Sequence, residues 1–93
     1  MADQQKALNI NISGRVQNVA CRSFLLERAI ELSIKGHVKN LSDGTVFVFA
    51  MGTNMQLDEF LEWCHEGSPI AQVEKVTVEV AELSEEISFK IIK

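Results

Sequence analysis

Apolar and polar residues alternate along residues 7–12, so this segment is predicted to be a strand whose apolar side chains face a core. Residues 36–41 and 73–80 also have strand character, and residues 87–91 can add a short last strand. Residues 45–51 are apolar almost throughout, which is typical of a strand in the middle of a sheet. The pattern therefore predicts a sheet with a short additional strand near its C-terminal end.

Two other segments repeat apolar residues with the period of an amphipathic helix. In the first, residues 23–33, the apolar side is formed by Leu25, Ala29 and Leu32. We expect Gly36 to end this helix. In the second, the repeat is carried by Leu57, Phe60, Leu61 and Cys64. Its N-cap is expected within residues 52–54, and the Gly-Ser-Pro sequence at residues 67–69 is expected to stop it.

These elements occur in the order β-α-β-β-α-β with a short extra C-terminal strand, which predicts a ferredoxin-like α/β sandwich of the α+β class. Ser42-Asp43-Gly44 is predicted to form the turn of a hairpin in the middle of the chain. Val73 breaks the alternation that places the later valines of its strand on one face, which predicts a bulge near the start of that strand. With 93 residues, of which 46% are hydrophobic, we expect one domain that spans residues 1–93.

The composition limits the classes of partner. A net charge of −4 and a pI near 5.1 argue against a nucleic-acid surface, because such surfaces depend on clustered Lys and Arg. The longest apolar run, residues 46–51, is too short to span a membrane, and residues 1–5 lack the basic and apolar regions of a secretion signal. We therefore expect a cytoplasmic protein in which Cys21 and Cys64 are thiols, with neither nucleic acid nor membrane as a partner.

The stretch from Gly14 to Arg22 connects the first strand to the first helix and is predicted to bind an anion. A glycine-started loop at this junction directs backbone N–H groups and the positive end of a helix at one point, which suits a phosphate. Arg22 lies in the first turn, where the helix macrodipole repels a cation. A bound anion would turn this repulsion into attraction, and a guanidinium can hold two phosphate oxygens at once. The alternative is a solvated surface arginine that water and salt screen.

The residues Gly14-Arg15-Val16-Gln17-x-Val19-x-x-Arg22 resemble the signature of the acylphosphatase family, and the resemblance covers nearly the whole chain. It continues through Ala29-x-x-Leu32-x-Ile34-x-Gly36-x-Val38-x-Asn40, Asp43-Gly44-Thr45-Val46, Gly52, Trp63, Gly67-Ser68-Pro69 and Phe89-Lys90-Ile91. Acylphosphatases have the ferredoxin-like sandwich fold, so the resemblance implies the same fold as the hydrophobic pattern. The fold alone would decide no function, because it hosts many.

The resemblance implies hydrolysis of acyl phosphates, which are carboxyl-phosphate anhydrides, to a carboxylate and inorganic phosphate. In the family, the residue that matches Arg22 grips the phosphoryl group and the residue that matches Asn40 holds the attacking water. The implied phosphate-binding residues are Gln17, Asn18, Val19, Ala20, Cys21 and Arg22, with the loop acting through its backbone amides. A carboxylate leaving group needs little protonation, so no metal, no cofactor and no covalent intermediate is implied. We expect a monomer whose partners are a small-molecule acyl phosphate and inorganic phosphate.

The loop departs from the usual pattern of the family at three positions. The family usually has glycine where this chain has Asn18, an aromatic residue where it has Cys21, and a bulkier residue where it has Ser23. Asn tolerates the left-handed backbone conformation better than other non-glycine residues, so Asn18 can preserve the shape of the loop. The alternative to an active enzyme is a phosphate-binding or regulatory domain of the same fold without turnover. A third alternative is a structural or partner-binding use of the sandwich.

Other chemistries fit these residues poorly. A cysteine phosphatase needs an arginine at the end of its loop, but the residue at the corresponding distance from Cys21 is Glu27. A zinc site is not expected, because the His and Cys residues lack the spacing of zinc ligands, and His37 is expected to pack instead. Phe47 and Phe49 share one face of a strand and are expected to belong to the core and not to an RNA-binding surface. Without the family resemblance, the Asn in the second strand would be interpreted as a partner of the following turn.

Overall fold

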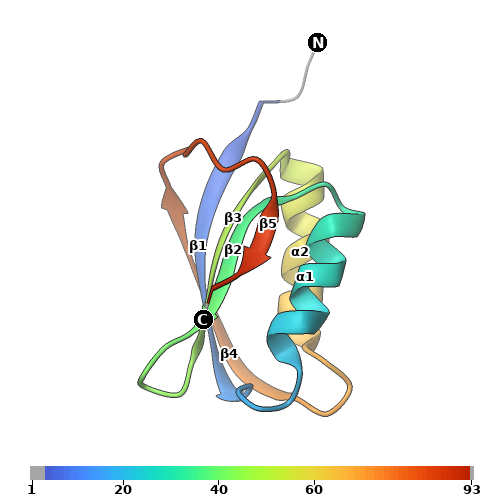
Figure 1. Cartoon of the computed structure of the whole chain (residues 1–93), viewed down its shortest axis with the longest axis vertical. Coiled ribbons are helices and arrows are strands. Elements are labelled where there is room, and N and C mark those ends of the chain that lie inside the picture. The colour runs from blue at the N-terminus through green and yellow to red at the C-terminus, as the bar shows by residue number, and fades with distance from the viewer. Residues whose placement is uncertain (1–3, 93) are drawn as a thin grey trace.

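The computed structural model describes residues 4–92, and it has two helices packed on one face of a five-stranded sheet (Figure 1). The elements are β1 (Lys6–Arg15), α1 (Cys21–Glu31), β2 (Lys35–Asn40), β3 (Val46–Gly52), α2 (Asn54–Glu66), β4 (Gln72–Ala81) and β5 (Phe89–Ile91). The predicted order β-α-β-β-α-β with a short C-terminal strand is therefore confirmed, as is the ferredoxin-like class.

The strands lie in the order β4-β1-β3-β2-β5. β1 pairs with β3 on one side and with β4 on the other, both antiparallel, whereas β5 lies parallel to β2 at the far edge. β3 occupies the centre of the sheet, as its nearly continuous apolar sequence predicted. The end of β1, the loop after it and the end of β2 are thereby brought to one end of the sandwich (Figure 1).

The main core lies between the sheet and the two helices. Its fully buried side chains include Ile10 and Ile12 from β1, Val48 from β3, Leu25 from α1 and Phe60 from α2. Side chains alternate between the two faces along each strand, so the periodicity of residues 7–12 identified the face that the helices cover. The prediction that apolar residues of the first strand face a core is confirmed.

A smaller apolar group lies on the opposite face of the sheet. It contains Ala7, Phe49 and Met51, with Phe47 partly buried beside them. Phe47 and Phe49 share a face, as predicted, and the prediction that they belong to a core is confirmed for Phe49, which is buried in this second cluster, whereas Phe47 is only partly buried. They alternate with the core residues of β3 and therefore point away from the helices. His37 stacks on Phe49 with ring centroids 5.6 Å apart, which agrees with its expected packing role.

The expectation that Gly36 ends the first helix is wrong. α1 ends at Glu31, and the residue with a left-handed backbone after it is Ser33, with a φ of 59°. Gly36 lies within β2, where its φ is 143° and an added Cβ would stand 1.8 Å from the carbonyl oxygen of Phe49. The position requires glycine because β2 and β3 approach closely there.

The boundaries of α2 follow its local sequence as predicted. Thr53 is the N-cap, and its side chain accepts a hydrogen bond from the backbone N–H of Gln56, 3.2 Å away. The Gln56 side chain in turn accepts from the Thr53 N–H at 2.8 Å, which completes a capping box. At the other end, Gly67 adopts a φ of 73° and its N–H donates to the carbonyl of Trp63.

The predicted bulge near the start of β4 is also present. The register with β1 passes from Ser13↔Lys75 to Gly14↔Val73, which leaves Glu74 without a facing partner. Gly14 has a φ of 119°, and a Cβ there would stand 2.2 Å from the carbonyl oxygen of Gln72. The bulge therefore bends the start of β4, where that strand pairs with the end of β1 next to the loop before α1.

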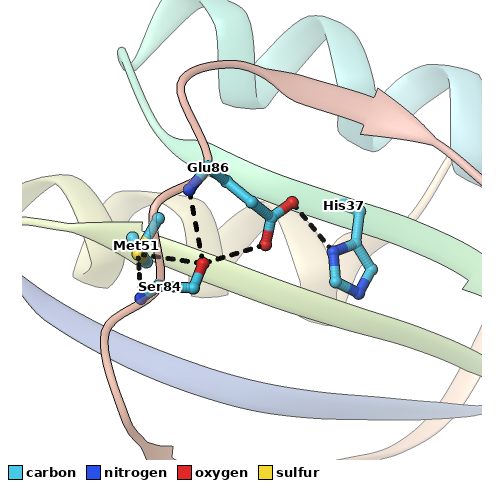
Figure 2. A network of polar contacts seen from close by, with 4 residues as sticks. All are labelled: His37, Met51, Ser84 and Glu86. Carbon is cyan, nitrogen blue, oxygen red and sulfur yellow. Dashed lines mark hydrogen bonds and ion pairs between the residues drawn. The ribbon is translucent and has the colours of Figure 1, made fainter.

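The segment between β4 and β5 is held to the open face of the sheet by polar contacts (Figure 2). Glu86 contacts Nδ1 of His37 on β2 at 3.0 Å. The Ser84 hydroxyl donates to the other carboxylate oxygen of Glu86 at 3.2 Å, and the Ser84 N–H donates to the sulfur of Met51 at 3.3 Å. These contacts lead the chain across β3 and β2 to the edge where β5 pairs.

Candidate active site

The loop that was predicted to bind an anion is shorter than the sequence indicated. β1 continues to Arg15, beyond the predicted change of pattern at Ser13, and α1 begins at Cys21 and not near Ser23. The connecting loop therefore comprises residues 16–20, which we call the phosphate loop. Arg22 lies in the first turn of α1, as predicted.

The phosphate loop leads to a helix N-terminus that has no side-chain cap. Asn18 and Ala20 adopt left-handed conformations, with φ values of 62° and 61°, so the predicted role of Asn18 in preserving loop shape agrees with its geometry. Ala20 is the N-cap residue of α1 and has no side-chain acceptor, and the first turn contains no acidic residue. The first N–H groups of the helix are left without intrahelical partners, which makes this end attractive to an anion.

Arg22 and Asn40, from two different elements, meet at one cavity beside this helix end. The cavity has a volume of about 260 Å³ and is lined by Val16, Asn18, Ala20, Cys21, Arg22, Ser23, Asn40 and Ile91. Two of the six predicted phosphate-binding residues, Gln17 and Val19, do not line it. The structure thus brings together the two predicted catalytic side chains, Arg22 and Asn40, with three further residues of the predicted phosphate-binding set.

Asn40 carries a polar atom that the rest of the described chain leaves unsatisfied. Its Oδ1 atom is buried and has no hydrogen-bond partner among residues 4–92. A buried polar atom without a partner costs about 1–3 kcal/mol, and this one belongs to a residue that lines the cavity. The alternative that Asn40 serves the turn at residues 42–44 is not supported by any side-chain hydrogen bond in that part of the structure.

Arg22 is a cation without a carboxylate partner in the described part of the chain, whose ion pairs are Arg28–Glu31 and His37–Glu86. The side chain is half-buried and lines the cavity next to the positive end of α1. Burial of a cation beside a like-signed dipole is unfavourable unless an anion joins them. The exposed Arg15 at the end of β1 does not line the cavity, so it offers a natural comparison.

The phosphate loop is tied to the hairpin that follows Asn40. The Gln17 side chain donates from Nε2 to the carbonyl oxygens of Leu41 and Thr45, at 2.7 and 2.8 Å. Thr45 also donates through its hydroxyl and its N–H to one oxygen of Asp43, at 2.6 and 3.0 Å. These bonds hold the pKa of Asp43 below its usual value. Gln17 therefore acts through its side chain on the scaffold, which explains its absence from the cavity lining.

Both cysteines are free and buried. Burial raises the pKa of the Cys21 thiol, with a smaller opposing effect of the Ser68 backbone N–H, and burial also raises the pKa of Cys64 well above its usual value. Neither residue is poised as a thiolate nucleophile. This agrees with the interpretation of both as packed thiols.

Two residues at this site were missed by the sequence analysis. Ser68 was interpreted only as part of a helix stop, but its buried hydroxyl donates to the carbonyl of Val19 in the phosphate loop at 2.5 Å. Ile91 was assigned only to the last strand, but it lines the cavity. Neither role has a local sequence signal, because each depends on which distant segments the fold brings together.

Residues 4–92 contain no group of three or more His, Cys, Asp or Glu side chains that could hold a metal ion. In the same residues, no helix is long and apolar enough to cross a membrane.

The fold and cavity define an α/β sandwich that presents the loop before α1, an arginine and an unsatisfied asparagine at one end. The family model described as Acylphosphatase matches residues 8–91. The chain belongs to the acylphosphatase family.

Relatives and solved structures agree with this assignment. The chain is 46% identical over 85 residues to an acylphosphatase of Archaeoglobus fulgidus, covering 91% of this chain and 96% of that one. The crystal structure of acylphosphatase from Bacillus subtilis superposes with a TM-score of 0.92 at 32% identity, covering 95% of this chain and 99% of the other. An acylphosphatase from Coxiella burnetii gives a TM-score of 0.91 at 33% identity, with coverages of 95% and 93%.

Proposed function

We propose that this acylphosphatase hydrolyses acyl phosphates in the cavity between the phosphate loop and Asn40. The observation that carries the proposal is the meeting of Arg22 and Asn40 at one cavity beside the uncapped N-terminus of α1. One side chain is a cation without a carboxylate partner among the described residues, and the other has a buried oxygen without a partner there. A phosphoryl group together with its attacking water would satisfy both.

Arg22 and the backbone amides of the phosphate loop bind the phosphoryl group in this proposal. The guanidinium holds two phosphoryl oxygens in fixed geometry, and the N–H groups at the start of α1 and in the loop take the remaining negative charge. These groups are already oriented in the folded chain, so they stabilise the charge that develops in the transition state without reorganisation.

Asn40 aligns the nucleophile. Its Oδ1 atom accepts a hydrogen bond from a water molecule and places the water oxygen in line with the bond to be broken. The water oxygen forms a bond to phosphorus, the bond from phosphorus to the acyl oxygen breaks, and the carboxylate leaves with the electron pair. The proton of the water passes to the phosphoryl group. The carboxylate is a good leaving group, so the proposed reaction uses no general acid and routes no step through a metal or cofactor.

We further infer that the chain works on a small-molecule substrate as a cytoplasmic monomer, with residues 1–93 as one domain and no nucleic-acid partner. The net charge of −4 supports the last point, because an acidic protein repels a polyanion but can hold one phosphate at a local cationic site. Size-exclusion chromatography with light scattering tests the oligomeric state.

The experiment for the main proposal is steady-state hydrolysis of benzoyl phosphate by the native chain and three variants. We expect turnover by the native chain and a loss of about 100-fold or more in Arg22→Ala and in Asn40→Ala, because each removes a group that acts in the transition state. Arg15→Ala is the matched control and should retain near-native turnover. Circular dichroism confirms that each variant is folded.

Two results would contradict the proposal. A folded native chain that binds phosphate without hydrolysing benzoyl phosphate would identify an anion-binding domain instead. Equal losses in Arg15→Ala and Arg22→Ala would show that general positive charge, and not the cavity arginine, carries the effect.

A further inference from the structure

Ser68 is the buried polar residue of the described chain, with an exposed fraction of 3%. It lies in the tight turn between α2 and β4, where the Gly67 N–H donates to Trp63 and the Ala71 N–H donates to the carbonyl of Ser68. The turn is therefore fixed by its own backbone bonds. A hydroxyl buried in a fixed turn is costly unless it has a partner, and the partner here is the phosphate loop.

The Ser68 hydroxyl fixes the orientation of one peptide group in that loop. It donates to the carbonyl oxygen of Val19 at 2.5 Å. In a planar trans peptide, the carbonyl of one residue and the N–H of the next point in opposite directions. Holding the Val19 carbonyl toward the buried turn therefore directs the Ala20 N–H the opposite way, and Ala20 lines the cavity.

The same bond maintains a strained backbone conformation. Ala20 has a φ of 61°, a left-handed value that costs a non-glycine residue about 1–2 kcal/mol. A half-turn of the Val19–Ala20 peptide would move this φ to about −120° at the observed ψ of 22°, close to the bridge region, which requires no positive φ. Such a flip would relieve the backbone strain at Ala20. It would also point the Val19 carbonyl at the cavity and turn the Ala20 N–H away from it. Without its hydrogen bond to Ser68, the relaxed conformation would be favoured.

We propose that Ser68 is a positioning residue for phosphate binding: it keeps the Val19–Ala20 peptide oriented so that the Ala20 N–H faces the bound phosphoryl group. This inference rests on the proposed function of the cavity. Ser68 acts through the loop and does not touch substrate, so it is not a catalytic residue.

The test combines a conformational and a functional measurement on the full chain. In Ser68→Ala, the three-bond coupling between the amide and α protons of Ala20 should change to that of a negative φ. The inhibition constant of inorganic phosphate should rise roughly 10- to 100-fold, because a hydrogen bond to a charged ligand is lost. In Ser68→Ala combined with Ala20→Gly, affinity should be largely restored, because glycine adopts the left-handed conformation without strain.

Thr53→Ala is the control for general destabilisation, since it removes the cap of α2 far from the loop. It should lower stability and leave phosphate inhibition unchanged. An unaltered Ala20 coupling in Ser68→Ala would overturn the inference whether or not phosphate binds. A changed coupling in a chain whose native form binds no phosphate would support the role of Ser68 in loop conformation and refute the function of the cavity.

Discussion

At the scale of the residue, the site consists of side chains and backbone groups in unfavourable states. Arg22 stands at the positive end of a helix, Asn40 buries an unsatisfied oxygen, and Ala20 adopts a conformation that suits glycine. These features are costly in the free chain, and in the proposed function an anion and a water molecule would make them favourable. All three residues line one cavity, which is the reason to interpret them together as a candidate site.

The strain at Ala20 gives a stability prediction. Ala20→Gly should raise the free energy of unfolding by about 0.5–1 kcal/mol, because relief of the left-handed strain exceeds the added flexibility of glycine in the unfolded chain. Ala20 is exposed, so little packing is lost. Urea unfolding measures the change. Ala81→Gly, in β4, is the comparison and should be destabilising; a loss of stability in Ala20→Gly would show that the loop is not strained there.

At the scale of the element, the hydrophobic periods predicted the helices, the strands and their order. Local caps also gave reliable boundaries, as at Thr53 and Gly67, because the sequence signal and the structural cause lie within one turn. The prediction that Gly36 ends a helix failed because glycine is required there by a contact with a segment distant in the sequence. The backbone of β3 passes close to Gly36. Contacts across the sheet leave no periodic trace in the sequence.

Two reasons for requiring glycine can be separated by experiment: a backbone contact that leaves no room for a Cβ, and a positive φ alone. Gly36 and Gly44 both have positive φ values, 143° and 92°, but a Cβ at Gly36 would collide with the carbonyl of Phe49, whereas nothing lies within 4 Å of one at Gly44. Gly36→Ala should therefore cost more than about 3 kcal/mol, and Gly44→Ala about 1 kcal/mol from backbone strain alone. Thermal unfolding of both variants makes the comparison, and equal losses would contradict it.

The difference between local features and contacts across the fold also explains how much of the site could be predicted from the sequence. Arg22 was found because its position in the first helical turn is a local feature, and Asn40 was found through the family resemblance. Ser68, Ile91 and the side-chain role of Gln17 were not found, because a hydrogen bond from one loop to another depends on the completed fold. Sequence reasoning identified the two polar side chains proposed to act on the substrate, Arg22 and Asn40, but not the residues that hold the loop in place.

At the scale of the whole molecule, the core contains two protonated thiols, Cys21 and Cys64. Burial raises the pKa of both thiols in the folded chain, so the folded state keeps these protons at pH values where the unfolded state loses them. The stability that the thiols contribute is complete below the unfolded pKa, about 8.5, and declines as the pH rises above it.

Urea unfolding between pH 7 and pH 10 tests this dependence. The free energy of unfolding should fall above about pH 8.5 in the native chain, and this fall should be reduced in a variant that carries both Cys21→Ala and Cys64→Ala. The variant starts from a lower stability, because it loses buried volume, so the slope with pH is the informative quantity. If the slope in the variant equals that in the native chain, groups other than the two thiols cause the loss of stability at alkaline pH.

The position of β1 in the sheet has a consequence for how fast the molecule assembles. This first strand lies between β3 and β4, and its residue Ala7 pairs with Met51 on one side and Ala81 on the other. The chain must close long loops before these pairings stabilise it, and such a high contact order slows folding. Because the phosphate loop continues directly from β1 and Ile91 of β5 also lines the cavity, the cavity forms only when both ends of the chain are in place.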